Sequence, residues 1–216
     1  MKNRSCAIIP VREFATTKLR LKDILSDDKR AALTATLITR VVKSIQQSRV
    51  NQIVVVASNP SEVTNTLPPS PKLAIVRESK MRGGVNSAMT DGMHLAKQEG
   101  ANKLLLLPSD LPRVNSPSVD KALDLLQERD LIICPSLKKD GTNLLGLDAS
   151  RKFELHYDDD SYSKHCNEAK QNGFDYVTLE WAEFSNDIDD PRDLERLSQN
   201  YRAPNFEDLL SKISSE

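Results

Sequence analysis

The chain has 216 residues, of which 38% are hydrophobic and 28% charged, and its formal net charge is −1 at pH 7. This composition is ordinary for a globular protein with a sizeable core, and it indicates neither intrinsic disorder nor a membrane protein. The near-zero net charge argues against a general nucleic-acid binder, because such proteins usually carry a basic surplus that neutralises phosphates.

Short apolar runs recur along the first two-thirds of the chain and are predicted to form strands. Each run is continuous and rich in Ile, Val or Leu, which is typical of strands that are buried on both faces of a sheet. A strand is therefore expected at each run. The runs span residues 6–9, 53–57, 73–76, 104–107 and 131–134.

Helical patterns lie between these runs. Ser26 is a suitable N-cap for a first helix, and the two acidic residues that follow it favour the positive end of a helix dipole. A second helix should open near Gly84 and close near Gly100. Ser116 and Pro117 mark the start of a third helix, as N-cap and N1 residue.

After residue 134 the alternation of apolar runs and helical patterns becomes less regular through residues 140–160. It resumes with a helix that ends near Gly173, a strand at residues 176–180 and a short helix from Pro191. The tail places apolar side chains at helical spacing, which could cover the body of the protein or a partner subunit. We therefore expect one domain at residues 1–202 and an amphipathic tail helix at residues 203–216.

The alternation of strands and helices predicts an α/β fold with a mostly parallel central sheet and helices on both faces. Sheets of this kind bind ligands beyond the carboxyl ends of their strands. Residues that carry chemistry should therefore follow the apolar runs directly, and the unusual residues of this sequence stand there.

The cysteines and the N-terminus indicate a cytoplasmic protein. Cys6, Cys134 and Cys166 are odd in number, widely spaced and without metal-ligand spacing, so buried thiols in a reducing compartment are expected. The apolar runs are too short to cross a membrane, and the N-terminus lacks the pattern of a signal peptide. We expect no membrane partner and no nucleic-acid partner.

The segment after the first strand, residues 10–21, contains no glycine. A phosphate-binding P-loop or a dinucleotide fingerprint needs glycines that let backbone N–H groups approach the anion, so both motifs are excluded here. Arg12, Lys18 and Arg20 could instead meet a polyphosphate with their side chains. A solvated basic loop is the alternative.

Gly83, Gly84 and Asn86 stand where the second helix should begin. Two glycines allow close backbone approach, a helix N-terminus offers free N–H donors, and an asparagine side chain can bind a base edge or a ribose. These residues could therefore hold a nucleotide. A plain tight turn is the alternative.

Carboxylates follow two later segments. Asp110 lies between two prolines directly after an apolar strand, at the expected ligand edge, where it could hold Mg²⁺ against phosphate oxygens. Asp187 and Asp189 point the same way if their segment is extended, and they could supply further ligands to the metal. A turn residue at Asp110 and a helix N-cap at Asp189 or Asp190 are the alternatives.

Two polar stretches, residues 140–143 and 157–165, could shape a second pocket. Thr142 and Ser161 can each donate a hydrogen bond to an anion, and a helix N-terminus at Ser161 would add backbone donors. His165 falls about one turn inside that helix, where a histidine is more often a packing or orienting residue than a catalyst.

Taken together, six motifs in order resemble those of the 2-phospho-L-lactate guanylyltransferases of coenzyme F420 biosynthesis. The resemblance covers about residues 5 to 200. The motifs are Ala7–Val11 with Lys18–Leu21, Gly83–Asn86, Leu107–Pro112, Gly141–Asn143, Ser161–Tyr162 with His165, and Asp187–Asp189 with Pro191.

This resemblance implies a GT-A-like nucleotidyltransferase fold, GTP as substrate, Mg²⁺ as cofactor and a homodimer. The acceptor it implies is 2-phospho-L-lactate, or phosphoenolpyruvate in bacterial relatives. With the residue pattern, it implies roles as follows: nucleotide binding for Pro10, Arg12, Gly83, Gly84 and Asn86; catalysis for Lys18, Arg20 and Asp110; metal binding for Asp110, Asp187 and Asp189; and acceptor binding for Thr142, Asp158 and Ser161.

The sequence departs from the family at two of these positions, since Asp158 stands where the family usually has glycine and Arg12 where lysine is common. Two other functions stay open at this point. One is a nucleotidyltransferase of the same fold with another phosphorylated acceptor, such as a sugar phosphate or a molybdopterin-type phosphate. The other is a nucleotide-binding relative without catalytic activity.

Overall fold

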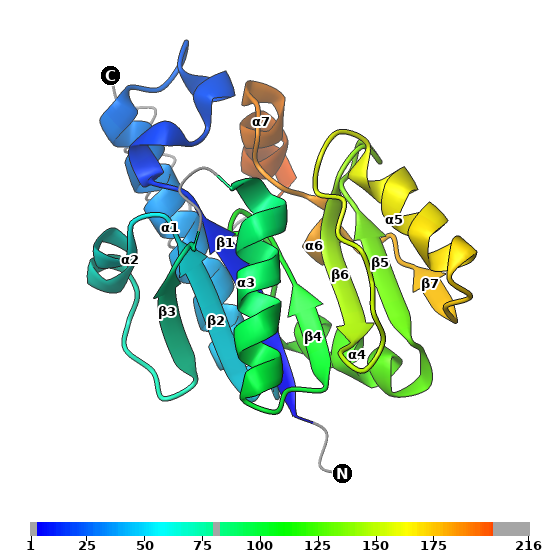
Figure 1. The fold of residues 1–216 in the computed structure, drawn as a ribbon. Helices are drawn as coiled ribbons and strands as arrows, with labels where there is room; N and C mark the ends of the chain where they lie inside the picture. The colour runs from blue at the N-terminus through cyan, green and yellow to red at the C-terminus, as the bar shows by residue number, and fades with distance from the viewer. Residues whose placement is uncertain (1–3, 80–82, 201–216) are drawn as a thin grey trace.

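The computed structural model of the protein describes residues 4–79 and 83–200, without the side chains of residues 198–200. A seven-stranded sheet forms the centre, in the order β3-β2-β1-β4-β6-β5-β7 (Figure 1). All neighbouring strands pair in parallel except β6, which is antiparallel to β4 and to β5. The strands are β1 (Ser5–Val11), β2 (Gln52–Ala57), β3 (Leu73–Arg77), β4 (Lys103–Leu106), β5 (Leu131–Pro135), β6 (Thr142–Asp148) and β7 (Tyr176–Thr178).

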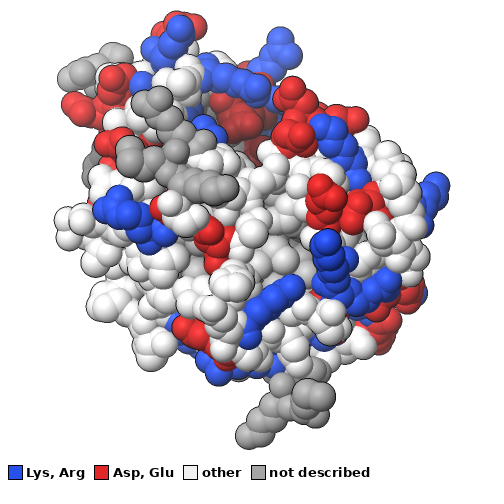
Figure 2. All heavy atoms as spheres, viewed as in Figure 1, with Lys and Arg blue, Asp and Glu red and all other residues white. Residues whose placement is uncertain are grey.

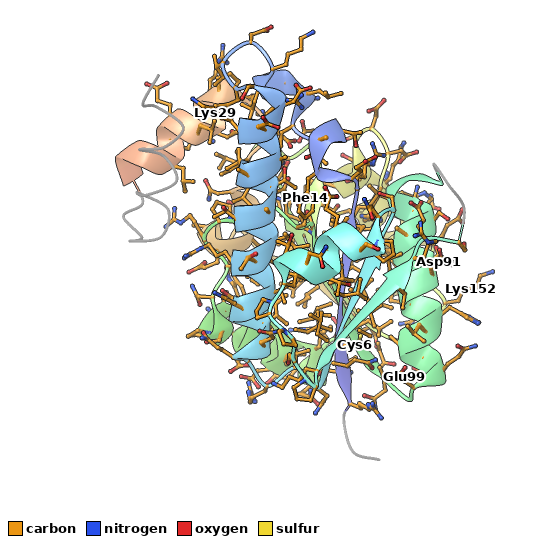
Figure 3. All side chains as sticks on the ribbon, turned by 90° about the vertical axis from the view of Figure 1, so that its left-hand side faces the viewer. Cys6, Phe14, Lys29, Asp91, Glu99 and Lys152 are labelled. Carbon is orange, nitrogen blue, oxygen red and sulfur yellow. The ribbon has the colours of Figure 1, made fainter. Side chains whose placement is uncertain are left out.

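Helices cover both faces of the sheet, as predicted. Helices α1, α2, α4 and α6 pack on one face, while α3 and α5 pack on the other, so the strands lie between two helical layers (Figures 1 and 3). Helix α7 packs against the first half of α1 in a separate apolar cluster. The helices are η1 (Phe14–Thr16), η2 (Leu19–Leu21), α1 (Asp27–Gln46), α2 (Pro60–Thr66), α3 (Gly84–Gln98), α4 (Ser116–Glu128), α5 (Ser161–Gln171), α6 (Ala182–Ser185) and α7 (Pro191–Asn200).

The apolar runs are continuous because the sheet is covered on both sides. In β1, Ala7 and Ile9 face the α1 layer, whereas Cys6 and Ile8 face the α3 layer, and all are fully buried. Figure 3 shows Cys6 in the layer between these helices. Strand β3 departs from the prediction, because it forms the edge of the sheet and its residues are only half-buried or exposed.

Several elements differ from the sequence prediction. Strand β6 was not predicted and lies within residues 140–160, where the sequence pattern is less regular. The short helices α2 and α6 were also not predicted. The N-cap of α4 is Asn115 rather than Ser116, because the Asn115 side chain accepts the N–H of Ser118 at 2.9 Å and forms a capping box with it. Pro117 is therefore the second residue of the helix, not the first.

The cysteine prediction is confirmed for two of the three thiols. Cys6 and Cys134 are buried, Cys166 is half-buried, and all three are free. The predicted tail helix at 203–216 lies outside the described residues. Within the described ranges, none of the helices has both the length and the apolar character that a membrane span requires.

Candidate active site

A cleft of about 1150 Å³ opens beyond the carboxyl ends of the central strands. Figure 2 shows a hollow at this upper end of the molecule, with acidic and basic side chains side by side on its rim. Most of the predicted site residues line the cleft, and Gly83 and Asn86 adjoin lining residues in the sequence. Asp187 instead lines a smaller neighbouring cavity and reaches the cleft through its hydrogen bond with the lining residue Asn143. The predicted residues on the lining are Pro10, Arg12, Lys18, Arg20, Gly84, Asp110, Thr142, Asp158, Ser161 and Asp189.

Lys18 joins two of the predicted metal ligands. Its side chain is only 7% exposed, and its Nζ donates to Asp110 Oδ2 and, at 3.2 Å, to Asp189 Oδ1. Burial alone would lower the pKa of Lys18, but the two carboxylates outweigh it and raise the pKa, so the ammonium group is charged. Arg20 lies at the rim, 73% exposed, with Nη1 4.0 Å from Asp189 Oδ2.

Asp110 and Asp189 flank this ammonium group, and Asp187 lies close enough to both for their charges to act on it. Asp110 Oδ1 is buried and has no hydrogen-bond partner in the part of the chain that the structure describes. Asp187 accepts a hydrogen bond from Asn143 Nδ2 at 3.1 Å. Burial, together with the nearby charges of Asp110 and Asp189, raises the pKa of Asp187 to about 7.

This arrangement fits a divalent cation. Mg²⁺ prefers hard oxygen ligands, and carboxylates that repel one another in a buried site are relieved by a cation between them. Such an ion could bind the oxygen of Asp110 that lacks a partner among the described residues. It would also favour the ionised form of Asp187, whose pKa is raised without it. The residue types therefore suit the metal that the sequence pattern implies, although the ligand atoms of Asp110, Asp187 and Asp189 do not all lie within 4.8 Å of one another.

The helix that follows these carboxylates is capped by another residue. Asp190 Oδ1 accepts the N–H groups of Arg192 at 2.9 Å and Asp193 at 3.2 Å, and Asp193 Oδ2 accepts the N–H of Asp190 at 2.9 Å. This reciprocal pair makes Asp190 the N-cap of α7. The Asp189 side chain is directed to Lys18 instead.

The glycines and the asparagine at the start of α3 have local structural causes. Gly84 has a φ of +75°, which favours glycine. A Cβ on Gly83 would lie 2.6 Å from the Ser87 side chain. Asn86 Oδ1 accepts the N–H of Tyr157 at 2.7 Å, so Asn86 ties α3 to the segment that leads into α5.

On the opposite side of the cleft, Thr142 and Ser161 are buried and their hydroxyl oxygens lie 3.4 Å apart. The N–H of His156 donates to His165 Nε2 at 2.9 Å, so the ring proton lies on Nδ1 and is donated to Thr142 Oγ1, also at 2.9 Å. Burial lowers the pKa of His165 to about 3, which keeps the ring neutral. His165 is thus a packing and orienting residue, as predicted.

Asp158 also lines this side, but it is exposed and paired. Its Oδ1 lies 3.0 Å from Lys164 Nζ, and this hydrogen bond lowers the pKa of Asp158. The negative charge of Asp158 is therefore partly balanced within the protein before any ligand arrives.

Ser58 and Glu78 line the cleft, and the sequence patterns did not single them out. Among the described residues, seven buried side-chain polar atoms lack a hydrogen-bond partner, and four of them belong to residues that line the cleft. Unsatisfied buried groups are rare in native proteins, so their concentration here indicates a ligand site. Ser58 and Glu78 directly follow β2 and β3, so the strand-end rule could have found them. The four atoms are Ser58 Oγ, Glu78 Oε1, Asp110 Oδ1 and Tyr157 Oη.

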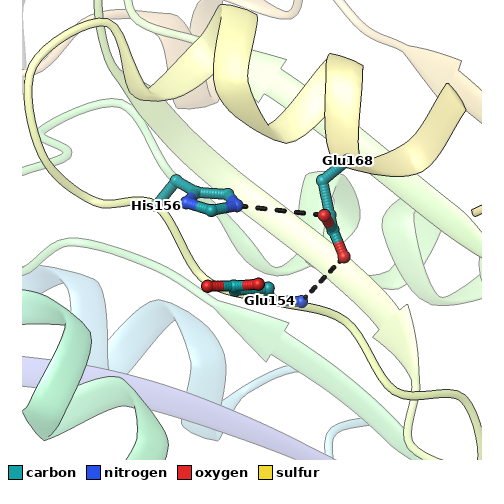
Figure 4. A group of neighbouring side chains, drawn as sticks. All are labelled: Glu154, His156 and Glu168. Carbon is teal, nitrogen blue, oxygen red and sulfur yellow. Dashed lines mark hydrogen bonds and ion pairs between the residues drawn. The ribbon is translucent and has the colours of Figure 1, made fainter. Parts of the chain in front are cut away.

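A group of possible metal ligands with closely spaced ligand atoms lies away from the cleft lining. Glu154, His156 and Glu168 bring their ligand atoms within 4.8 Å of one another (Figure 4). Glu168 Oε1 accepts the N–H of Glu154 at 3.3 Å, and Glu168 Oε2 lies 3.9 Å from His156 Nε2. These contacts fasten the segment before α5 onto that helix.

Comparison with known proteins extends over nearly the whole chain. The family profile described as "Guanylyl transferase CofC like" matches residues 5–213. The 2-phospho-L-lactate guanylyltransferase of Methanocaldococcus vulcanius is 29% identical over 187 residues, which are 87% of this chain and 81% of that protein. The phosphoenolpyruvate guanylyltransferase of Rubrobacter xylanophilus is 29% identical over 88% of this chain and 92% of its own. The 3-phospho-D-glycerate guanylyltransferase of Phenylobacterium zucineum is 28% identical over 97% and 96%.

Solved structures share the fold at lower identity. A nucleotide-diphospho-sugar transferase-like protein of Desulfovibrio desulfuricans G20 superposes with a TM-score of 0.83 at 20% identity, covering 99% of this chain and 96% of that one. A nucleotidyl transferase of Methanothermobacter superposes with a TM-score of 0.67 at 14% identity, covering 91% and 97%. The fold is therefore that of the nucleotidyltransferases, as predicted.

Proposed function

The chain belongs to the family of CofC-like guanylyl transferases, and from this premise we propose that it transfers GMP from GTP to 2-phospho-L-lactate or phosphoenolpyruvate, releasing pyrophosphate, in coenzyme F420 biosynthesis. One observation carries the proposal. Lys18, Asp110 and Asp189 are in direct contact within a cleft at the carboxyl edge of the sheet, with Asp187 beside them. That cluster supplies the charges that a triphosphate and its cation require.

In the proposed reaction, an oxygen of the acceptor phosphate attacks the α-phosphorus of GTP in line. A new P–O bond forms, and the bond from the α-phosphorus to the bridging oxygen breaks as pyrophosphate leaves. The acceptor phosphate is already largely ionised near pH 7, so the step needs no general base. Within the described residues, the cleft lining includes no histidine and no cysteine, which agrees with such a step.

The chain's own residues position the reactants and neutralise charge. Lys18 is held charged at the centre of the cleft, and Arg12 and Arg20 stand exposed on its lining, where they can approach the triphosphate. Asp110, Asp187 and Asp189 would hold Mg²⁺. When bound, this ion would screen the phosphate oxygens and make the α-phosphorus more electrophilic.

The acceptor would lie at the other side of the cleft. Thr142 accepts from His165 and from Ser161, so the proton of its own hydroxyl remains available to a ligand. The pair therefore has at least one donor left for an anionic group. This donor set suits the phosphate or carboxylate of a small acid.

A panel of nucleotides and acceptors tests the function. GTP, ATP, CTP and UTP are each combined with 2-phospho-L-lactate, phosphoenolpyruvate, a sugar phosphate and 3-phospho-D-glycerate, which the Phenylobacterium relative makes a candidate. Pyrophosphate release is measured with Mg²⁺, and unphosphorylated lactate serves as the control acceptor. We expect release with GTP and one of the phosphorylated acids.

Two results would count against the proposal. Release with a sugar phosphate alone would mean a different acceptor class on the same fold. GTP binding without release for any acceptor would mean a nucleotide-binding protein without turnover.

A further inference from the structure

One oxygen of the half-buried Glu78 side chain lacks a partner among the described residues. Glu78 directly follows β3 and lines the cleft, and its Oε1 is buried with no hydrogen-bond donor among the residues that the structure describes. A buried carboxylate oxygen without a donor costs free energy, because it has lost its hydration and gained nothing in return. The reaction steps described above do not use Glu78, so this cost has no explanation in them.

The position of Glu78 in the sheet assigns it to one end of the cleft. The strand order places β3 and β2 at the edge, β1 and β4 in the centre and β6 beyond them. Lys18 and Asp110 follow the central strands, and Thr142 begins β6. Neighbouring strands lie about 4.8 Å apart, so Glu78 lies roughly 10–15 Å across the sheet from the phosphate cluster. The acceptor side is farther still.

This order leaves a defined place for the base of the nucleotide. If the phosphates lie at the centre and the acceptor lies over β6, then the nucleoside must extend toward β2 and β3. The separation is comparable to that between the base and the α-phosphate of an extended nucleotide. Glu78 therefore lies where the edge of the base would arrive.

The start of α3 accommodates the Glu78 carboxylate at that place. A Cβ on Gly83 would lie 3.2 Å from Glu78 Oε1, so the missing side chain of Gly83 makes room for the carboxylate. Gly83 is the N-cap of α3, and the positive end of that helix favours a negative charge beside it. Gly83 thus contributes to the nucleotide site through Glu78.

We propose that Glu78 recognises the guanine base by accepting hydrogen bonds from its N1–H and 2-amino groups. A carboxylate offers acceptors only, and guanine presents two adjacent donors on this edge. Adenine places an acceptor nitrogen where guanine has N1–H. This nitrogen would face the carboxylate oxygens of Glu78, which are also acceptors, and no hydrogen bond would form. The inference rests on the proposed use of GTP and adds to it the residue that selects the base.

Binding measurements without an acceptor test this inference. The affinities of Mg²⁺-GTP, Mg²⁺-ITP and Mg²⁺-ATP are measured by calorimetry for the wild type, Glu78→Gln and Glu78→Asp. The matched control is Glu128→Gln, which removes the same charge from an exposed residue at the end of α4, outside the cleft lining. Thermal unfolding of every variant verifies that the fold is intact.

The wild type should bind GTP more tightly than ITP by about tenfold, because ITP lacks the 2-amino donor. Glu78→Gln should reduce the ratio of GTP to ATP affinity by about a hundredfold, since a carboxamide can pair with adenine as well as with guanine. Glu78→Asp keeps the charge but withdraws it by one methylene, so an intermediate ratio is expected. Glu128→Gln should leave the ratio unchanged.

An unchanged ratio in Glu78→Gln would overturn the assignment, even if guanylyl transfer were demonstrated. A ratio that depends on Glu78 would support it, even if no acceptor in the panel released pyrophosphate. The two proposals therefore fail separately.

Discussion

At the scale of single residues, the negative charge of Asp110 is expected to matter most for activity. One of its oxygens pairs with Lys18, and the other is buried with no partner in residues 4–79 and 83–200. Asp110→Asn keeps the shape but removes the charge, so Mg²⁺-dependent pyrophosphate release should fall by at least about a hundredfold while the fold persists. The measurements are an Mg²⁺ titration of activity and thermal unfolding.

Asp124→Asn is the matched control for this change, because Asp124 is exposed on α4, where it pairs with Arg49. It should retain full activity. Near-normal turnover of Asp110→Asn at saturating Mg²⁺ would show that Asp110 does not hold the metal.

Asp187 should make the stability of the metal-free protein depend on pH. Its folded pKa of about 7 lies above the ordinary value of 3.8, so the protonated form is the stable one in the folded state. This stabilisation is complete below the unfolded pKa and is lost as the pH rises through about 7. Between pH 5 and pH 8, the free energy of unfolding should therefore fall more in the wild type than in Asp187→Asn, by about 1–3 kcal/mol.

Chemical denaturation without Mg²⁺, at several pH values, measures this difference. His165 has a lowered pKa and acts in the opposite direction, with stability lost on acidification, but it is present in both proteins and cancels in the comparison. Parallel pH profiles for the two proteins would contradict the prediction.

At the scale of elements, the sequence predicted strands best where the environment is uniform. The runs in β1, β2 and β5 are buried along their length, so apolar character alone identifies them. Strand β6 escaped prediction because it begins with Thr142 and Asn143 and contains Gly146. A Cβ on Gly146 would lie 2.6 Å from Ile132, so this glycine marks close packing between strands rather than a turn.

The site shows the same division between local and long-range information. The positions of Asp110 and Ser161 on the cleft were predictable because each stands after a strand or at the start of a helix, where ligands usually bind. Asn143 was predicted only as a member of a polar stretch, because its contact with Asp187 depends on what lies opposite it in space, whereas Glu78 was missed although it directly follows a strand. Asn143 donates to Asp187, which is 44 residues away in the sequence.

The packing of α3 on the sheet gives an element-scale prediction. Gly92 faces the sheet, and a Cβ there would lie 2.4 Å from Ile8 Cγ2 and 3.2 Å from Val56 Cγ2. Gly92→Ala should therefore lower the free energy of unfolding by about 1–3 kcal/mol, despite the better helix propensity of alanine. Chemical denaturation measures the change.

Thr90→Ala is a control on the exposed side of the same helix, where no packing opposes the propensity. It should be neutral within about 0.5 kcal/mol. If Gly92→Ala were as stable as Thr90→Ala, α3 would have to sit farther from β1 than the structure shows.

At the scale of the whole molecule, the candidate site joins distant parts of the chain. Lys18 contacts Asp110 and Asp189, which are 92 and 171 residues away in the sequence. The β1 loop, the end of β4 and the segment before α7 must all be in place before the site exists. The homodimer remains a prediction, because the tail that would support it lies outside the described residues.

The charge balance between Lys18 and its two carboxylate partners leads to a prediction about metal binding. In the structure, the Lys18 ammonium group sits against two of the carboxylates that would hold Mg²⁺, and it neutralises part of their charge. Lys18→Met removes this competing cation while filling similar space. The variant without nucleotide should therefore bind Mg²⁺ about tenfold more tightly than the wild type, although its guanylyl transfer should fall because the triphosphate loses a partner.

Calorimetric titration with Mg²⁺ in the absence of GTP measures the affinity, and Lys22→Met is the matched control. Lys22 is exposed in the same loop and is not part of the cleft lining, so its removal should change Mg²⁺ affinity little. Weaker Mg²⁺ binding in Lys18→Met would mean that the ammonium group organises the carboxylates rather than competing for them. In that case Lys18 and the metal would act together, and the three carboxylates would not form a metal site on their own.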